Sequence, residues 1–478
     1  MKNYDVIMIG AGSAGLGNAG VANTIGLKTL LIEVDEKNFG GDCTNYGCVP
    51  SKALIHISKL FHAAKQAVPF GMQVEGKANM EKVLAYIHQK QDTIRSGEDA
   101  EHHRKQGIDV EIGWAKFINK NTLEVNGQQF SAKVILLCTG SSPRELEIEG
   151  MEDISVYTNE TLFFDCKKLP ENLVVIGGGA IGCEMAQAFQ RLGSQVYIVD
   201  RGERILSKER KEISKVLESQ FEKEGLQVIH EAEVIAFKNG KAMLKTKNGQ
   251  KEIPCDAALM AVGRVVNIKG MELEKAGIKL TEKGKIQVNE YLQTTNKKVY
   301  AIGDAAGTYM FSHGAEKMVR QLWRNLLIPI FKKKNTTKNL SWVTFTDPQV
   351  ATFGWDEEKM KKENVDFYRQ DQSFEEDDRA IVESYEYGKM SIWTTNGSNI
   401  GNRNILSGTM IAPQAGELVQ ELQLAMETKI PVKKITERVY PYPVASRINQ
   451  KTLRGMMEKT FTETKKKLAR WAFRTFRN

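Results

Sequence analysis

The sequence predicts an α/β fold with two Rossmann-like dinucleotide-binding domains, followed by a third region of strands and helices. At 4–15 and again at 172–182, an apolar strand runs into a G-x-G-x-x-G turn. Each copy continues into a second strand that ends in an acidic residue, Glu33 or Asp200, eighteen residues after the last glycine. Two complete strand, turn, helix, strand units with matching acid spacing indicate two dinucleotide sites.

The length of 478 residues agrees with this organisation, since roughly 150 residues per domain gives about three domains. A composition of 41% hydrophobic and 26% charged residues is that of a globular protein and excludes a disordered, collagen-like or disulfide-stapled chain. No stretch approaches the ~20 apolar residues that span a bilayer. The apolar run Val6 to Ile9 leaves no room for a targeting peptide before it, so we expect a cytoplasmic protein.

Buried strands and a polar linker place the expected domain boundaries. The strand that ends at Cys138 resembles the later strand in CDAALMAVGRVVN, and VYAIGDAAG adds another buried strand before Asp304. The stretch 331–339 is polar, basic and without periodicity, so it predicts a linker. We expect a first dinucleotide domain over 1–150 and 268–335, a second over 151–267, a third domain over 340–450 and a tail over 451–478.

The glycine-rich turns predict where pyrophosphates bind, because glycine permits a tight turn and close backbone approach at a helix N-terminus. The glycines with this role are Gly10, Gly12 and Gly15 in the first copy and Gly177, Gly179 and Gly182 in the second. Glu33 and Asp200 would accept hydrogen bonds from the ribose hydroxyls. An acid at Asp200 favours NAD over NADP, although Arg201 and Arg204 could neutralise a 2′-phosphate.

Cys43 and Cys48 are the only closely spaced pair among the six cysteines. Five residues apart on a regular helix, they would be too distant to form a disulfide, so they can bridge only across a loop or a distorted first turn. Gly47 supplies the backbone freedom, and a helix N-terminus with Lys52 one turn along would stabilise a thiolate on Cys48. The stretch therefore predicts a redox pair.

Two other interpretations of these cysteines remain open. They could be buried structural thiols, or they could form half of a zinc site, which would need two further ligands. Only His56 is near in sequence, so we expect no metal.

A dithiol beside one dinucleotide site, with a second such site elsewhere, indicates a two-electron relay. A nicotinamide reduces a disulfide poorly by itself, whereas a flavin can react with both a nicotinamide and a thiol. We therefore expect FAD at the first site and NAD(H) or NADP(H) at the second.

The stretch GGDCTNYGCVPSKAL (40–54) resembles the active-site stretch of the flavin-dependent pyridine nucleotide-disulfide oxidoreductases, which include dihydrolipoamide dehydrogenase, glutathione reductase and mercuric reductase. The resemblance covers residues 4 to about 450 through GAGSAG, LLCTG, GGGAIGCE, AVGRVVN, YAIGDAAG and FTDPQVATFG. It implies dinucleotide-binding domains of the three-layer ββα type, an α+β C-terminal dimerisation domain and a role in cell redox homeostasis. It also implies a homodimer whose active site is completed by the partner chain.

The resemblance implies individual roles as well. Cys43 would exchange with substrate, Cys48 would contact the flavin, and Lys52 would lie by the flavin N5 edge and pair with Glu184. Further residues implied at the FAD site are Ala115, Thr139, Gly140 and Asp304, and Arg201 and Gly263 are candidates for the NAD(P) site.

One family feature is missing from this sequence. The His-Pro that normally supplies a catalytic base is replaced by Tyr442-Pro443, and Arg447 replaces the glutamate that pairs with that histidine. A phenol with a pKa near 10 is protonated at neutral pH and can only donate a hydrogen bond. Oxidation of a dithiol should therefore lose roughly the 10²–10⁴ that general base catalysis contributes.

Three functions follow as hypotheses. PSKAL (50–54) and FSHGAEKMV (311–319) are most similar to dihydrolipoamide dehydrogenase, which favours that type of enzyme. Mercuric reductases also have a tyrosine near position 442, so a mercuric-reductase-like or other NAD(P)H-dependent reductase of a disulfide or soft metal is the alternative. A redox-inert flavoprotein that serves as a binding subunit is the third, and it would act on no disulfide substrate.

The tail concentrates the charge of the chain. The net charge is 67 − 59 = +8, and residues 451–478 hold nine Lys/Arg against two Glu, or +7 of it. Such a tail is unlike the basic face of a nucleic-acid-binding domain. As a helix it would place Met457, Phe461, Leu468 and Trp471 in one apolar stripe. The helix could pack on its own dimer, or contact an anionic membrane or an acidic partner.

Overall fold

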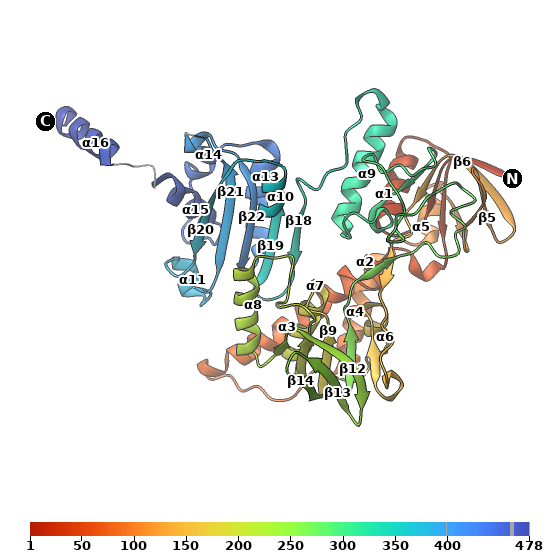
Figure 1. Ribbon diagram of the computed structural model, residues 1–478, viewed down its shortest axis with the longest axis horizontal. Coiled ribbons are helices and arrows are strands. Elements are labelled where there is room, and N and C mark those ends of the chain that lie inside the picture. Colours follow the sequence, from red (N-terminus) through yellow and green to blue (C-terminus); the bar gives the residue numbers. More distant parts are fainter. Residues whose placement is uncertain (398, 459–462, 478) are drawn as a thin grey trace. The chain divides into compact units, whose positions relative to one another are not determined.

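The computed structural model describes residues 1–397, 399–458 and 463–477, and they form two compact units (Figure 1). Unit 1 contains residues 1–206 and 221–336, and unit 2 contains residues 207–220 and 337–478. The boundary between Thr336 and Thr337 falls inside the predicted linker 331–339. Each unit is described by itself.

A seven-stranded sheet forms the first part of unit 1. Its main path runs β3-β2-β1-β6-β5-β4, and β17 pairs with β6. The central strands are parallel, whereas β4, β5 and β6 form antiparallel pairs. The strands are β1 (Lys2–Ile9), β2 (Thr29–Glu33), β3 (Asp109–Ile112), β4 (Lys116–Asn119), β5 (Thr122–Val125), β6 (Gln128–Leu137) and β17 (Val299–Ala301).

The helices of this part connect the strands and carry the cysteine segment. Helix α1 packs against α9, and α3 packs against both α4 and α7 (Ala180–Leu192). The helices are α1 (Ser13–Thr24), α2 (Gly41–Asn45), α3 (Cys48–Gln66), α4 (Met80–Arg95), α5 (Ala100–Lys105) and α9 (Ser312–Leu327), with 3₁₀ turns η1 (Glu36–Asn38), η2 (Val68–Phe70), η4 (Gly303–Ala306) and η5 (Pro329–Phe331).

The rest of unit 1 contains a five-stranded parallel sheet of order β11-β10-β9-β15-β8, a three-stranded antiparallel sheet of order β12-β13-β14 and an antiparallel pair of β7 and β16. Helix α7 packs on the parallel sheet, and the three-stranded sheet shares a buried apolar core with it that includes Val174, Tyr197 and Leu244. The elements are β7 (Ser141–Pro143), η3 (Met151–Asp153), β8 (Ser155–Tyr157), α6 (Asn159–Asp165), β9 (Asn172–Ile176), α7 (Ala180–Leu192), β10 (Gln195–Val199), β11 (Gln227–Ile229), β12 (Ala232–Lys238), β13 (Lys241–Thr246), β14 (Gly249–Pro254), β15 (Ala257–Met260) and β16 (Arg264–Val266). This arrangement confirms the predicted fold class with its ββα layers.

Unit 2 is built on a five-stranded antiparallel sheet of order β18-β19-β22-β21-β20. Its core joins the sheet to helices α12 to α15 through buried residues such as Phe353, Leu422 and Leu453. The strands are β18 (Ser341–Thr344), β19 (Gln349–Gly354), β20 (Phe367–Ser373), β21 (Lys389–Thr395) and β22 (Ile405–Ala412). The helices are α10 (Glu357–Lys362), α11 (Asp378–Val382), η6 (Ile400–Asn402), α12 (Ala415–Leu418), α13 (Gln420–Thr428), α14 (Val432–Thr436), α15 (Arg447–Glu458) and α16 (Glu463–Phe476).

Residues 207–220 belong to unit 2 although their neighbours in sequence belong to unit 1. Helix α8 (Lys211–Lys223) begins there. Glu209, just before it, is buried and accepts hydrogen bonds from Trp342 Nε1 at 2.5 Å and Thr352 Oγ1 at 2.7 Å. Burial raises the pKa of Glu209, and the two hydrogen bonds satisfy its carboxylate. They also attach the segment to β18 and β19.

In the described part of the chain, no helix combines the length and apolar character that crossing a bilayer requires.

Candidate active site

The two cysteines lie on consecutive short elements of unit 1. Gly40 and Gly41, with φ of 85° and 62°, turn the chain into α2, which carries Cys43. Helix α3 begins at Cys48, after a break at Gly47, where a Cβ would lie 2.6 Å from Asp42 Oδ2. The break interrupts the helix between the two cysteines, and both are free thiols in this structure.

The environment of the two thiols changes their pKa values in opposite directions. The hydrogen bond from Cys43 lowers the pKa of Cys48 to about 6, and Ser312 and the charge of Lys52 act in the same direction. The same hydrogen bond, together with burial, raises the pKa of Cys43. Among the causes that favour a thiolate on Cys48, the hydrogen bond from Cys43 is therefore larger than the charge of Lys52.

Lys52 and Glu184 form an ion pair between α3 and α7. Lys52 Nζ lies 2.8 Å from Glu184 Oε2, and the glutamate side chain is only 7% exposed. The pair expected from the resemblance is therefore present, one helical turn from Cys48. A buried carboxylate fixes the position of the ammonium beside the thiolate.

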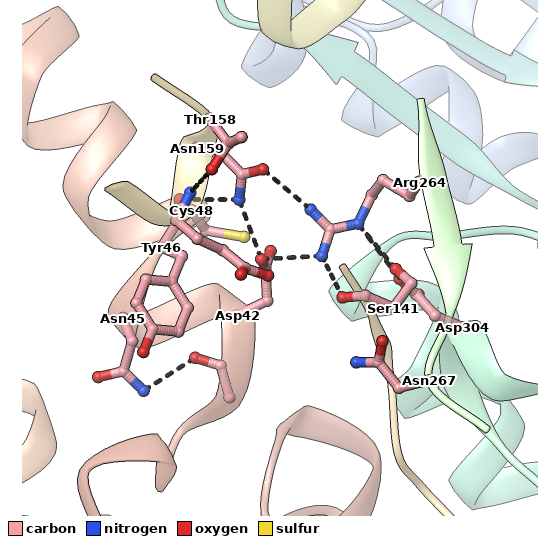
Figure 2. Close-up of polar contacts among 12 residues, drawn as sticks. Asp42, Asn45, Tyr46, Cys48, Ser141, Thr158, Asn159, Arg264, Asn267 and Asp304 are labelled. Atoms are coloured by element: carbon pink, nitrogen blue, oxygen red, sulfur yellow. Dashed lines mark hydrogen bonds and ion pairs between the residues drawn. The ribbon is translucent and has the colours of Figure 1, made fainter. Parts of the chain in front are cut away.

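A polar cluster around Asp42 was not predicted from the sequence (Figure 2). Arg264, at the start of β16, donates one hydrogen bond to Asp42 Oδ1 at 2.9 Å and another to Ser141 Oγ at 2.7 Å. Ser141 Oγ in turn donates to Asp304 Oδ2 at 2.6 Å, and Asn159 Nδ2 donates to Asp42 Oδ1 at 3.1 Å. The cluster connects Asp304 to the residue that precedes Cys43.

The residues around the first glycine-rich turn fit a bound dinucleotide. A Cβ on Gly10, where φ is +105°, would lie 2.3 Å from the Cys138 carbonyl oxygen, and one on Gly15 would lie 1.7 Å from the Gly10 oxygen. Helix α1 then begins after Gly12 with no side-chain cap, so its first N–H groups can bind an anion.

Two further observations support this fit to FAD. Within the described residues, the buried Thr139 Oγ1 has no hydrogen-bond partner, and a Cβ on the neighbouring Gly140 would meet open space. Glu33 is buried, and its oxygens accept from the N–H groups of Ala11 at 2.6 Å and Val34 at 2.8 Å. Each oxygen keeps a second lone pair for a ribose hydroxyl. Ala115, between β3 and β4, is buried.

The second glycine-rich turn repeats this construction. A Cβ on Gly177 would lie 2.5 Å from the Ala261 oxygen and one on Gly182 1.9 Å from the Gly177 oxygen, while Gly179 precedes α7 without a side-chain cap. Asp200 accepts from the N–H groups of Gly178 at 2.5 Å and Gly202 at 2.6 Å.

Two more residues predicted for the NAD(P) site have definite positions. Arg201 is ion-paired with Glu233 on β12. Gly263, with φ of +106°, directly precedes Arg264, and a Cβ there would meet open space.

Tyr442 lies in unit 2 and is 67% exposed. Its hydroxyl donates to Asp378 at 3.2 Å, and the negative charge of that carboxylate raises the pKa of Tyr442. The Arg447 guanidinium lies over the tyrosine ring, 5.2 Å from its centroid. Tyr442 is therefore held in its protonated form, as the sequence predicts, and cannot serve as a base at neutral pH.

A zinc site at the cysteines finds no support. The described residues contain no group of three or more His, Cys, Asp or Glu side chains that could hold a metal ion. His56, the ligand nearest in sequence, instead stacks on Tyr86 at a ring-centroid distance of 6.1 Å.

Comparison with known proteins places these features in a family. The family model "Pyridine nucleotide-disulphide oxidoreductase" matches residues 4–318, and the model of its dimerisation domain matches residues 340–452. A mercuric reductase from Lysinibacillus sphaericus is 31% identical over 445 residues, covering 92% of this chain and 80% of the relative. A dihydrolipoyl dehydrogenase from Thermus scotoductus is 31% identical over 455 residues, covering 93% and 96%.

Solved structures show the same fold. The Cu(II) complex of the HOCl-induced flavoprotein disulfide reductase RclA from Escherichia coli aligns with a TM-score of 0.82 at 24% identity, covering 95% of this chain and 99% of that one. LpdA from Mycobacterium tuberculosis aligns with a TM-score of 0.82 at 23% identity, covering 95% and 100%. The chain therefore belongs to the pyridine nucleotide-disulphide oxidoreductase family, and it is an FAD-dependent enzyme that uses NAD(P)H.

Proposed function

We propose that this enzyme works as an NAD(P)H-dependent reductase of a disulfide substrate, with dithiol chemistry of the dihydrolipoamide dehydrogenase type. The observation that carries the proposal is the cysteine pair, in which the pKa of Cys48 is lowered and that of Cys43 is raised, in a chain whose Tyr442 is protonated. Oxidising a dithiol substrate needs a base at this point, whereas reducing a disulfide needs protons for the departing thiolates. We therefore propose disulfide reduction, in which solvent can protonate the departing thiolates, as the direction in which the enzyme works.

The dithiol reaction is balanced without a histidine. Bound FAD would carry two electrons from NAD(P)H to the Cys43–Cys48 disulfide. Cys43 then attacks a substrate disulfide and releases the first thiol, which takes the proton that Cys43 loses. Cys48 thiolate attacks the sulfur of Cys43, reforms the protein disulfide and releases the second thiolate, which takes a proton from solvent. The sum is NAD(P)H, H⁺ and a disulfide giving NAD(P)⁺ and two thiols.

The other residues would hold this reaction in place. Lys52, fixed by Glu184, would stabilise negative charge beside Cys48. Residues proposed to bind FAD are Gly10, Gly12, Gly15, Glu33, Ala115, Thr139, Gly140 and Asp304. Residues proposed to bind the nicotinamide nucleotide are Gly177, Gly179, Gly182, Asp200 and Gly263. NAD is favoured over NADP, because Glu233 already engages Arg201.

The proposed domains follow the sheets. The seven-stranded sheet, with β17 from the later segment, supports an FAD domain over 1–150 and 268–335, and the five-stranded parallel sheet supports an NAD(P) domain over 151–267. Residues 340–450 would be the dimerisation domain, which supports a homodimer. We propose that the partner chain completes the active site.

A soft-metal acceptor is the second candidate. The two cysteine thiolates could hold a soft Hg(II) ion while NAD(P)H supplied two electrons through bound FAD, a reaction that requires no general base, and a mercuric reductase is among the relatives. A redox-inert subunit is disfavoured by the intact cysteine pair and the intact Lys52–Glu184 ion pair.

Anaerobic titration of the FAD-loaded enzyme tests these alternatives. NADH, and to a lesser extent NADPH, should bleach the flavin, and oxidised lipoamide, glutathione disulfide or Hg(II) should then restore its colour. In Cys43→Ser the flavin should bleach but should not pass its electrons to the substrate. Cys255→Ser, which changes a buried thiol away from this chemistry, should behave as wild type. Absence of bleaching by either nucleotide would exclude the proposal.

A further inference from the structure

Helix α16 presents an unusual surface. Its large apolar side chains are more than half exposed: Leu468 62%, Trp471 59%, Phe473 70% and Phe476 76%. Helix α15 differs, because its apolar residues Ile448, Leu453 and Met456 are at most 1% exposed in the core of unit 2. The match to the dimerisation family model ends at residue 452, so α16 lies beyond it.

This arrangement changes the stripe predicted from the sequence. Met457 packs against the core of unit 2 and does not share a surface with Leu468 and Trp471. Phe461 lies outside the described residues. The amphipathic surface is therefore that of α16 alone.

The charges of α16 are segregated from its apolar side chains. At about 100° per residue, Trp471, Leu468, Phe476 and Phe473 share one broad arc of the helix. A second arc holds the cations Lys466, Lys467, Arg470 and Arg474, together with the single carboxylate of the helix. That carboxylate, Glu463, pairs with Lys466 at 3.1 Å and with Arg470 at 3.5 Å, which places it on the cationic arc.

Lys465 falls within the apolar arc at the first turn. Its aliphatic stem can lie along apolar surface while the ammonium reaches the helix end. It therefore does not interrupt the apolar arc.

We propose that α16 binds the surface of an anionic lipid bilayer and holds the enzyme peripherally on a membrane. An exposed face of Trp, Phe and Leu opposite a Lys/Arg face is the composition of helices that lie in the headgroup region. Fourteen residues extend only about 21 Å, which is too short for the ~30 Å hydrocarbon core, so the helix lies in the membrane plane. The cations contact anionic headgroups while the rings enter the acyl boundary.

Vesicle flotation of the full-length, FAD-loaded enzyme tests this assignment. We expect binding to vesicles of equal parts phosphatidylcholine and phosphatidylglycerol, weaker binding to pure phosphatidylcholine, and release at high salt. Leu468→Glu with Trp471→Glu should abolish binding. Lys466→Glu with Arg470→Glu and Arg474→Glu should weaken it by at least about 100-fold, because each cation near an anionic surface contributes roughly fivefold.

A matched control variant distinguishes the effect of the α16 surface from the effect of net charge. Lys332→Glu with Lys333→Glu and Lys334→Glu makes the same charge change at exposed positions of unit 1 and should leave vesicle binding intact. Flavin content and NADH oxidation should be unchanged in all variants. The proposal is wrong if the wild-type enzyme does not float with anionic vesicles, or if the control triple variant loses binding equally. It is also wrong if the α16 variants turn a dimer into a monomer by light scattering, because α16 would then cover a second copy of the chain.

Discussion

Replacing Arg264 by glutamine should raise the pKa of Cys48. Arg264 is 12% exposed and is the cation that compensates Asp42, the carboxylate next to Cys43. The charge of Asp42 opposes thiolate formation at Cys48. Without Arg264 that charge is uncompensated, so the thiolate should become less stable.

Coulomb's law gives the order of magnitude of the effect. Two unit charges taken to be roughly 8 Å apart interact by about 2 kcal/mol at an effective dielectric constant of ~20, which corresponds to a pKa change of about 1.5. Because the Asp42 side chain is 38% exposed, solvent screening should reduce the change to about 0.5–1. The midpoint of Cys48 ionisation should therefore move from near pH 6 to roughly pH 6.5–7.

The assay is the rate of iodoacetamide alkylation of each cysteine against pH, resolved by mass spectrometry in the anaerobically reduced enzyme. Asp42→Asn should move the Cys48 midpoint in the opposite direction, and Asp42→Asn with Arg264→Gln should return it close to wild type. Arg264→Lys, which keeps the charge, should shift it less than Arg264→Gln.

These substitutions leave the other charged side chains around the cluster in place. Those side chains are Lys52, Glu184, Glu160 and Asp304. Flavin content and circular dichroism would identify a variant that fails to fold. If Arg264→Gln and Asp42→Asn shift the midpoint in the same direction, or if neither shifts it, the electrostatic reasoning is refuted.

Three further predictions concern the cysteines, the missing base and the first glycine-rich turn. Alkylation of Cys48 in the wild-type enzyme should be half-maximal near pH 6, and Cys43→Ala should raise that midpoint, because it removes the hydrogen-bond donor that stabilises the thiolate; an unchanged midpoint would contradict the assigned cause. Tyr442→His with Arg447→Glu should raise kcat/KM for dihydrolipoamide oxidation by roughly 10²-fold at pH 7–8, with a matching gain for lipoamide reduction because a catalyst cannot change the equilibrium, and no gain in either direction would show that the missing base does not limit the reaction. Gly10→Ala should lower bound flavin per chain, measured by absorbance after desalting, because the added Cβ would lie 2.3 Å from a backbone oxygen.

The sequence alone was enough to predict the architecture and to identify the two cysteines that we propose react. The glycine turns and the cysteine stretch are local patterns, in which the spacing itself determines the backbone geometry. Gly10 and Gly177 both adopt the left-handed conformation that only glycine accepts readily, and Gly47 breaks the helix between the two thiols. The absence of the histidine base is likewise visible in the sequence at one position, Tyr442.

The tertiary structure decided which charges surround those atoms. Arg264 and Asp42 are 222 residues apart, and Asp304 and Ser141 are 163 apart, so no local pattern could predict that they form one cluster. The burial of α15 and the exposure of α16 also depend on whether a core lies beside each helix, although both have amphipathic sequences. Local spacing fixes backbone conformation, whereas electrostatic environment and burial are sums over residues that only folding brings together.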